Sequence, residues 1–182
     1  MILGRAQELK YLNTYYDREG SQIMVVYGEK NVGKTSLLKE FVQDKSFHYY
    51  KARSASEREQ LYQWGKELSE NEIRTLKYPS FGELLRAVIK DGQSGKRVII
   101  IDEFQYIVKA SDTFMRELVN FVHDGWHGEG VMVVLCSSSI GWVENSMISK
   151  IGAAAYELSG FLKIKELEFE DMMEYYPGFN ME

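Results

Sequence analysis

The feature that most constrains this chain is an eight-residue run lying between two apolar segments. Residues Gly28 to Thr35 read G-E-K-N-V-G-K-T, which fits the pattern G-x-x-x-x-G-K-[ST]. A β-branched run at 23–27 precedes it and a segment with helical periodicity at 35–42 follows it, so it joins a buried strand to a helix. Its two glycines let the backbone turn so that several N–H groups face one anion, at the positive end of the helix. The sequence therefore predicts a phosphate-binding loop.

The residues of this loop have separate predicted tasks. Lys34 places its ammonium group on the β- and γ-phosphates of a nucleotide, and the Thr35 hydroxyl completes the coordination of Mg²⁺. A surface loop that merely holds two glycines and a lysine is the alternative, and the strand before and the helix after argue against it. The predicted nucleotide-binding residues of the loop are Gly28, Glu29, Lys30, Asn31, Val32, Gly33, Lys34, Thr35 and Ser36.

Two acids follow another strongly apolar segment. Residues 98–101 read V-I-I-I, and Asp102 and Glu103 come next. A strand this apolar is buried on both faces of a sheet, so the acids emerge at its carboxyl end, where open α/β sheets bind ligands. Asp102 is then placed to hold Mg²⁺ through a water, and Glu103 to orient and deprotonate an attacking water. Standing alone, either acid would be read as a helix cap or a solvated strand end.

Three serines follow the apolar segment at 131–136. A hydroxyl of Ser137 or Ser138 would reach between the terminal phosphate and the attacking water, which makes both candidate catalytic residues beside Glu103 and Lys34. The alternative is that the serines cap a helix that begins near Ile140. The sequence favours neither interpretation, and one serine can serve each role.

Strand-like and helix-like segments alternate along the whole chain, without repeats, low-complexity tracts or linkers. This alternation predicts an α/β fold with a parallel sheet covered on both faces, as one domain over residues 1–182. Ser56 with Glu59, and Ser80 with Glu83, predict capping boxes at two helix starts. The expected strands are 23–27, 47–52, 97–101, 131–136 and 161–167; the expected helices are 5–18, 35–42, 56–68, one opening at 80, 112–122 and a short one after 168.

Charge and composition limit the partners. The chain has 22 Lys and Arg against 27 Asp and Glu, a net charge of −5, whereas nucleic acids and anionic membranes normally require a basic face. No signal sequence is visible, and no apolar run approaches the roughly 20 residues of a membrane-spanning helix. The single cysteine, Cys136, excludes an internal disulfide and fits a reducing compartment. We therefore expect a cytoplasmic protein that does not bind membranes. The charge does not indicate nucleic-acid binding, although a net charge leaves a local basic patch open.

Four segments together resemble the archaeal-type ATPase family, a prokaryotic group in the AAA+ and STAND region of P-loop ATPases: LGRAQELKYL, GEKNVGKTSLL, VIIIDEFQYI and VVLCSSSIG. The resemblance runs from Ile2 to about Pro177. It implies a three-layer αβα P-loop NTPase fold with a five-stranded, mainly parallel sheet of order 5-1-4-3-2, and ATP and Mg²⁺ as ligands. It also implies that Leu3, Gly4 and Arg5 line the adenine, and that Ser137 or Ser138 is a polar sensor of the γ-phosphate.

The chain departs from that family's pattern in two places. Relatives carry an arginine after the sensor, whereas residues 152–160 here contain none, and an arginine finger is worth roughly 10³–10⁵ in rate. Relatives also continue into a helical lid, which we expect this chain to lack, as a truncated or a minimal form.

Three functions remain open from the sequence. The first is Mg-dependent ATP hydrolysis, and the second is an ATP-bound switch or interaction module with little hydrolysis. Either would exchange ATP for ADP and contact a protein partner or further copies through an AAA+-like surface. A nucleoside or nucleotide kinase fits less well, because few arginines are placed to clamp a transferred phosphate.

Overall fold

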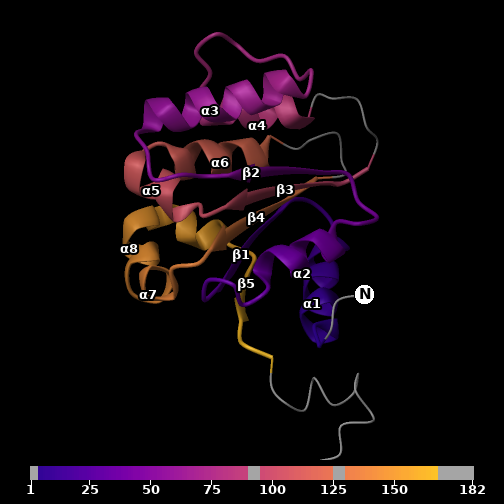
Figure 1. The fold of residues 1–182 in the computed structure, drawn as a ribbon. Coiled ribbons are helices and arrows are strands. Elements are labelled where there is room, and N and C mark those ends of the chain that lie inside the picture. The colour runs from indigo at the N-terminus through magenta and orange to yellow at the C-terminus, as the bar shows by residue number, and fades with distance from the viewer. Residues whose placement is uncertain (1–3, 90–94, 125–129, 168–182) are drawn as a thin grey trace, which may run out of the picture.

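The fold is a single parallel sheet between two layers of helices (Figure 1). The computed structural model describes residues 4–89, 95–124 and 130–167. The strand order is β2-β3-β4-β1-β5, and each neighbouring pair is parallel, which confirms the predicted order. The strands are β1 (Gln22–Gly28), β2 (Phe47–Lys51), β3 (Arg97–Asp102), β4 (Val131–Ser137) and β5 (Gly160–Ile164).

Helices cover both faces of the sheet, as Figure 1 shows. One face is covered by α1 (Ala6–Tyr16) and α2 (Lys34–Phe41), which pack on it through their own apolar core. The other face carries a larger core and the remaining helical segments. These are α3 (Glu57–Glu70), α4 (Phe81–Ile89), α5 (Gln105–Ala110), α6 (Phe114–His123), α7 (Ile140–Trp142), the π-helical turn η1 (Val143–Met147), α8 (Ile148–Ile151) and the 3₁₀ segment η2 (Gly152–Glu157).

Side chains alternate between the two cores along each strand, because a β-strand has a period of two. On β3, Val98 and Ile100 lie in the core beneath α1 and α2, whereas Ile99 and Ile101 lie in the other core. Continuing this alternation, Asp102 falls on the face that carries α2. The acid that ends β3 and the helix that follows the glycine loop therefore share one face of the sheet.

The predicted capping box is complete at α4, and at α3 one of its two bonds is present. Ser56 accepts a hydrogen bond from the backbone N–H of Glu59 at 3.3 Å, at the start of α3. At the start of α4 the exchange is reciprocal: the Ser80 N–H donates to the Glu83 carboxylate at 2.7 Å, and the Glu83 N–H donates to the Ser80 hydroxyl at 3.3 Å. These local bonds fix where the two helices begin.

The elements differ from the expected ones in one added helix and in several boundaries, most of them by one or two residues. The segment after β3 forms α5, which the sequence pattern did not predict, and α6 begins at Phe114 rather than at 112. The last strand ends at Ile164 rather than at 167, and the helix expected after 168 lies outside the described residues. Within the described part of the chain, none of the helices has both the length and the apolar character that crossing a membrane requires.

Candidate functional site

The glycine loop leaves β1 and enters α2 through backbone in the left-handed region. Gly33, directly before α2, has φ 100° and ψ 11°, and Asn31 has φ 67°. Glycine adopts positive φ at little cost, and asparagine tolerates it better than most residues. Turns of this kind direct successive N–H groups to one side, which makes a concave site for an anion.

Gly28 is needed for a different reason from the predicted one. Its φ is not in the left-handed region, so the turn does not require a glycine there. A Cβ atom at Gly28 would instead lie 2.3 Å from the carbonyl oxygen of Ile164 and 3.1 Å from Val32 Cγ1. The first glycine of the pattern therefore allows the end of β1 to pack closely against the edge strand β5.

The Lys34 side chain lies over the glycine loop and is buried. Its ammonium group donates to the carbonyl oxygens of Gly28 at 2.8 Å and Glu29 at 2.6 Å. These bonds hold the positive charge at the mouth of the loop, next to the N-terminus of α2, where the helix dipole also favours an anion.

The carboxylate of Asp102 forms the opposite wall of the site and is also buried. It accepts a hydrogen bond from the Tyr49 hydroxyl at 2.6 Å and another from the Glu103 backbone N–H at 3.0 Å. Burial, and then the bond to Asp102, raise the pKa of Tyr49 above its ordinary value, so the tyrosine stays a donor.

Glu103 has φ 55°, a conformation that costs energy in any residue except glycine. Its carboxylate accepts bonds from the Ser138 hydroxyl at 2.7 and 2.8 Å, the Ser138 N–H at 3.2 Å and the Gln105 amide at 2.5 Å. Burial by itself raises the pKa of Glu103, but the bonds from Ser138 and Gln105 and the Lys34 charge together lower it below the ordinary value. Glu103 is therefore ionised at neutral pH.

These walls enclose one cavity of about 340 Å³. It brings together residues from the glycine loop, α2, β2, β3 and the end of β4, at the carboxyl edge of the sheet. Nine of its lining residues were predicted from the sequence, and Lys51, at the end of β2, was not. The lining residues are Lys30, Asn31, Gly33, Lys34, Thr35, Ser36, Lys51, Asp102, Glu103 and Ser138.

The two candidate sensor serines have separate surroundings. Ser138 lines the cavity and bonds to Glu103, whereas Ser137 is fully buried and its hydroxyl accepts the Ser139 N–H at 3.1 Å. The structure therefore brings Ser138 to the other site residues. Gly28, Glu29 and Val32 belong to the loop but do not line the cavity.

The segment expected to line an adenine contributes a buried arginine. Arg5 donates to the carbonyl oxygens of Val32 at 2.9 Å and Lys165 at 2.7 Å, and pairs with Glu8 at 2.8 Å. It thus connects the chain before α1 to the glycine loop and to the segment after β5. Gly4 precedes it with φ 62°, and Leu3 lies outside the described residues.

Sequence reasoning missed three residues of this site: Tyr49, Lys51 and Gln105. Tyr49 and Lys51 are two apart on the segment predicted as a strand, so their shared face was readable from the strand period. That this face would meet Asp102 depends on β2 pairing with β3, which no local pattern reveals. Gln105 gave no signal, because α5 was not predicted.

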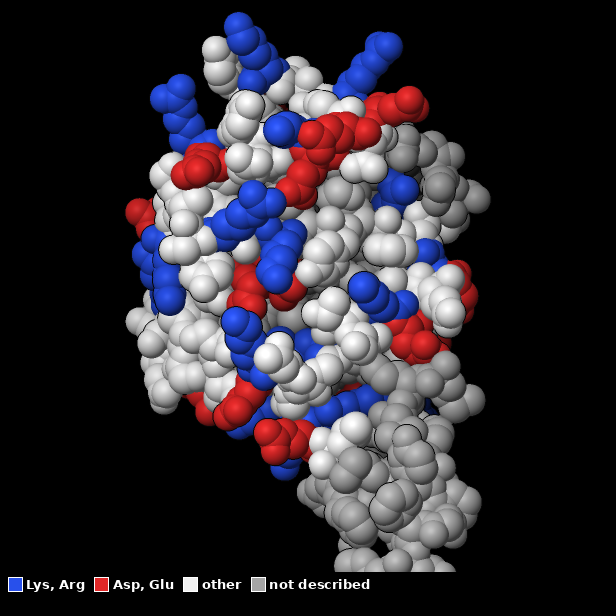
Figure 2. Space-filling view, in the orientation of Figure 1, with Lys and Arg blue, Asp and Glu red and all other residues white. Residues whose placement is uncertain are grey.

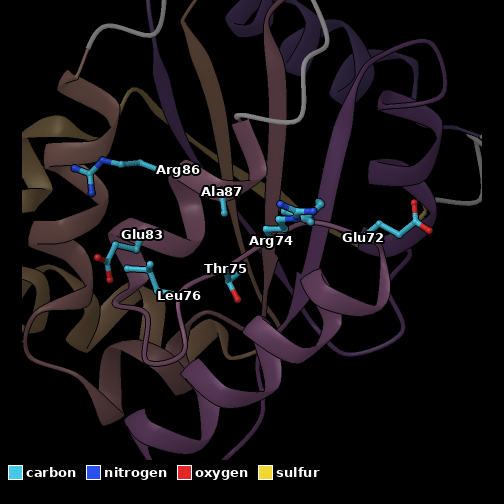
Figure 3. A pocket seen from close by; sticks show the side chains of 8 residues that line it. Glu72, Arg74, Thr75, Leu76, Glu83, Arg86 and Ala87 are labelled. Atoms are coloured by element: carbon cyan, nitrogen blue, oxygen red, sulfur yellow. The ribbon is translucent and has the colours of Figure 1, made fainter.

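A second cavity, of about 680 Å³, lies between α4 and the segment that precedes it (Figure 3). It shares no lining residue with the first. Two of its charged side chains already have partners, because Glu83 takes part in the α4 capping box and Arg86 pairs with Asp124 at 2.8 Å. Figure 2 shows basic and acidic side chains interspersed on the face drawn, as expected from the nearly balanced composition.

Comparisons with known proteins identify the family of the chain. A family model described as an ATPase domain predominantly from Archaea matches residues 2–180. An uncharacterized protein of Methanocaldococcus jannaschii is 25% identical over 178 residues, which are 97% of this chain and 38% of that protein. An uncharacterized ATP-binding protein of the same organism is 33% identical over 45 residues, which are 25% of this chain and 76% of that protein.

Solved structures share the fold. A Walker-type ATPase of Pyrococcus abyssi superposes with a TM-score of 0.65 at 16% identity, over 97% of this chain and 57% of that one. The ORC1 protein of Aeropyrum pernix, solved in complex with DNA, gives 0.64 at 16% identity, over 97% of this chain and 50% of that one. The chain thus spans about half of these solved chains, and 38% of the first relative.

Proposed function

Because this chain belongs to the family of ATPase domains found predominantly in Archaea, we propose that it binds ATP with Mg²⁺ and hydrolyses it to ADP and phosphate. The observation that carries the proposal is that Lys34, Asp102, Glu103 and Ser138 line one cavity, beside a loop shaped for an anion. A cation, two carboxylates and a hydroxyl at the mouth of such a loop are the parts that phosphoanhydride hydrolysis requires.

The residues present fit a magnesium ion. Thr35 offers a hydroxyl and Asp102 a carboxylate in the same cavity, and oxygen atoms of these kinds are the ligands that Mg²⁺ takes together with water and phosphate. When bound, Mg²⁺ would supply positive charge to the β- and γ-phosphates.

The chain's own residues divide the remaining work. The loop N–H groups, Lys34 and the N-terminus of α2 stabilise negative charge on the phosphates. Glu103, ionised at neutral pH, accepts a hydrogen bond from the attacking water and then its proton, as that water forms its bond to the γ-phosphorus and ADP departs. Ser138 and Gln105 hold Glu103 in place. The reaction then depends on positioning and electrostatics rather than on a covalent intermediate.

Two substitutions test this function. Glu103→Gln keeps the size of the side chain but removes the base, so ATP affinity should stay near wild type while turnover falls at least about a hundredfold. Lys34→Ala should abolish ATP binding measured by calorimetry. Lys39→Ala, an exposed lysine on the same helix, is the control for charge and should bind like wild type. Turnover that survives in the Glu103→Gln variant would refute the role of Glu103.

The second candidate is an ATP-bound switch with little hydrolysis, acting on a protein partner or on further copies of the chain in the cytoplasm. It is favoured by one observation: no arginine is among the described residues that line the cavity. Turnover by the purified chain discriminates the two functions. A rate per molecule that rises with protein concentration indicates that a second copy completes the site, whereas stable ATP occupancy at all concentrations supports the switch.

A further inference from the structure

The edge strand of the sheet contributes a side chain to the centre of the site. Tyr49, on β2, donates its hydroxyl proton to Oδ2 of Asp102 at 2.6 Å. The other carboxylate oxygen, Oδ1, accepts the N–H of Glu103 at 3.0 Å. Each oxygen of this carboxylate therefore has a donor within the chain, and the two bonds together fix the plane of the carboxylate.

The sheet itself places Tyr49 there. β2 pairs with β3 so that Tyr49 lies opposite Ile100, and Lys51 lies opposite Asp102. Tyr49 and Asp102 share the face that carries α2, and the Tyr49 ring packs against the core beneath that helix. Because the ring is held by this packing, its hydroxyl reaches two residue pairs further along the strands, to Asp102.

The other neighbouring strand borders the acid with a buried side chain. Cys136 lies opposite Asp102 on β4, and its side chain is buried in the core beneath α2. An ionised carboxylate has about four acceptor positions. The bonds from Tyr49 and Glu103 occupy one position on each oxygen. The positions that remain for a ligand in the cavity therefore have directions set by these two bonds.

We propose that Tyr49 is a positioning residue for Asp102, whose hydroxyl bond aims the open side of the carboxylate at the water shell of the nucleotide-bound Mg²⁺. The inference rests on the proposed ATP and Mg²⁺ function. The role of Tyr49 can be tested apart from that function, because it concerns how strongly Mg²⁺ increases the affinity for the nucleotide. Without the bond, the carboxylate can rotate among several orientations, of which one suits the metal.

The test compares Tyr49→Phe with a matched control on the next residue. Tyr49→Phe keeps the ring and its packing and removes only the hydroxyl. Tyr50→Phe makes the same change on the opposite face of β2, where the hydroxyl bonds to Gln60 at 2.8 Å. The affinity for a non-hydrolysable ATP analogue is measured by calorimetry in chelator and then at increasing Mg²⁺, with thermal unfolding of each variant alongside.

The expected result separates metal use from folding. Tyr49→Phe should bind the analogue within about twofold of wild type in chelator, and should need about tenfold more Mg²⁺ for half of the metal-dependent tightening. Tyr50→Phe should follow wild type in both measurements. In an Asp102→Asn background, Tyr49→Phe should change the Mg²⁺ requirement no further, because the pair acts as a unit.

Several results would overturn the inference. One is an unchanged Mg²⁺ requirement in Tyr49→Phe, and another is an equal loss of affinity with and without the metal, which marks a general structural role. An effect of full size in the Asp102→Asn background would do the same. If the wild-type chain binds no nucleotide, the proposed function fails first, and that outcome is seen before any variant is compared.

Discussion

Replacing Ser138 by alanine tests whether the site depends on how Glu103 is held. The serine hydroxyl lies 2.7 and 2.8 Å from the two carboxylate oxygens, and alanine removes it while keeping the backbone donor at 3.2 Å and the Gln105 donor. A hydrogen bond to a charged group contributes about 1.5–3 kcal/mol. Both side chains are half-buried, so the lower value, about 1.5 kcal/mol, is the appropriate one. If the transition state loses this stabilisation, kcat falls about tenfold.

The assay is steady-state hydrolysis at saturating Mg-ATP over a range of pH. In Ser138→Ala, kcat should fall about tenfold while ATP affinity changes little, because the serine bonds to Glu103 and not to the glycine loop. The bond also favours ionised Glu103, so its loss raises the pKa of Glu103 and moves the acid limb of the rate profile to higher pH. Ser139→Ala changes the neighbouring residue, the N-cap of α7, whose side chain makes no capping bond, and it should leave both kcat and the acid limb unchanged. An unaltered kcat and acid limb in Ser138→Ala would refute the reasoning.

Two further predictions concern stability. In Gly28→Ala the added Cβ meets the Ile164 carbonyl oxygen at 2.3 Å, so the free energy of unfolding in urea should fall by about 2–3 kcal/mol. Gly20→Ala is the control, because positive φ is its only cost, and its loss should be much smaller. Equal losses in the two variants would contradict the close approach of β1 and β5. Burial, and then the Arg97 charge, lower the pKa of His48 from 6.5 to about 4. As the pH falls, the unfolded chain therefore binds this proton at a higher pH than the folded chain does. The stability that is present above pH 6.5 is then lost toward pH 4. In His48→Gln the side chain still offers an acceptor to the Trp64 N–H but cannot titrate. Between pH 6.5 and 4 the free energy of unfolding of this variant should fall by up to about 3 kcal/mol less than that of wild type. Parallel curves of stability against pH would contradict the role of His48.

Most of the fold was predictable because its signals are local. Apolar β-branched runs bounded by glycine or charge gave β1, β3 and β4, and shorter runs with aromatic residues gave β2 and β5. Serine–glutamate pairs gave the starts of α3 and α4. The strand order came from the resemblance, since no local signal states which strands pair. α5 was missed for a physical reason. This six-residue helix packs against α3 and α6, and it is stabilised by tertiary contacts of Ile107 and Val108 rather than by a cap or a full helical repeat.

Some residues of the site were likewise predictable from local signals and others were not. Lys34, Asp102 and Glu103 were predicted because each belongs to a short motif at the end of a strand or the start of a helix. The structure places all three around one cavity. The sequence could not decide whether Ser137 or Ser138 contacts Glu103. The answer depends on where β4 ends, because that sets which of the two side chains points toward Glu103. A one-residue change in where the strand ends would exchange their positions.

Gly28 shows most clearly what a motif leaves out. The pattern identified the right residue but supported the wrong reason, because the contact that forbids a side chain comes from Ile164, in the last strand of the sheet. Arg5 makes the same connection from the other end of the chain, bonding at once to the loop at Val32 and to Lys165 after β5. The glycine loop is thus held by contacts from both ends of the described chain. Its shape is a property of the assembled sheet, and a peptide carrying the motif alone would not be expected to adopt it.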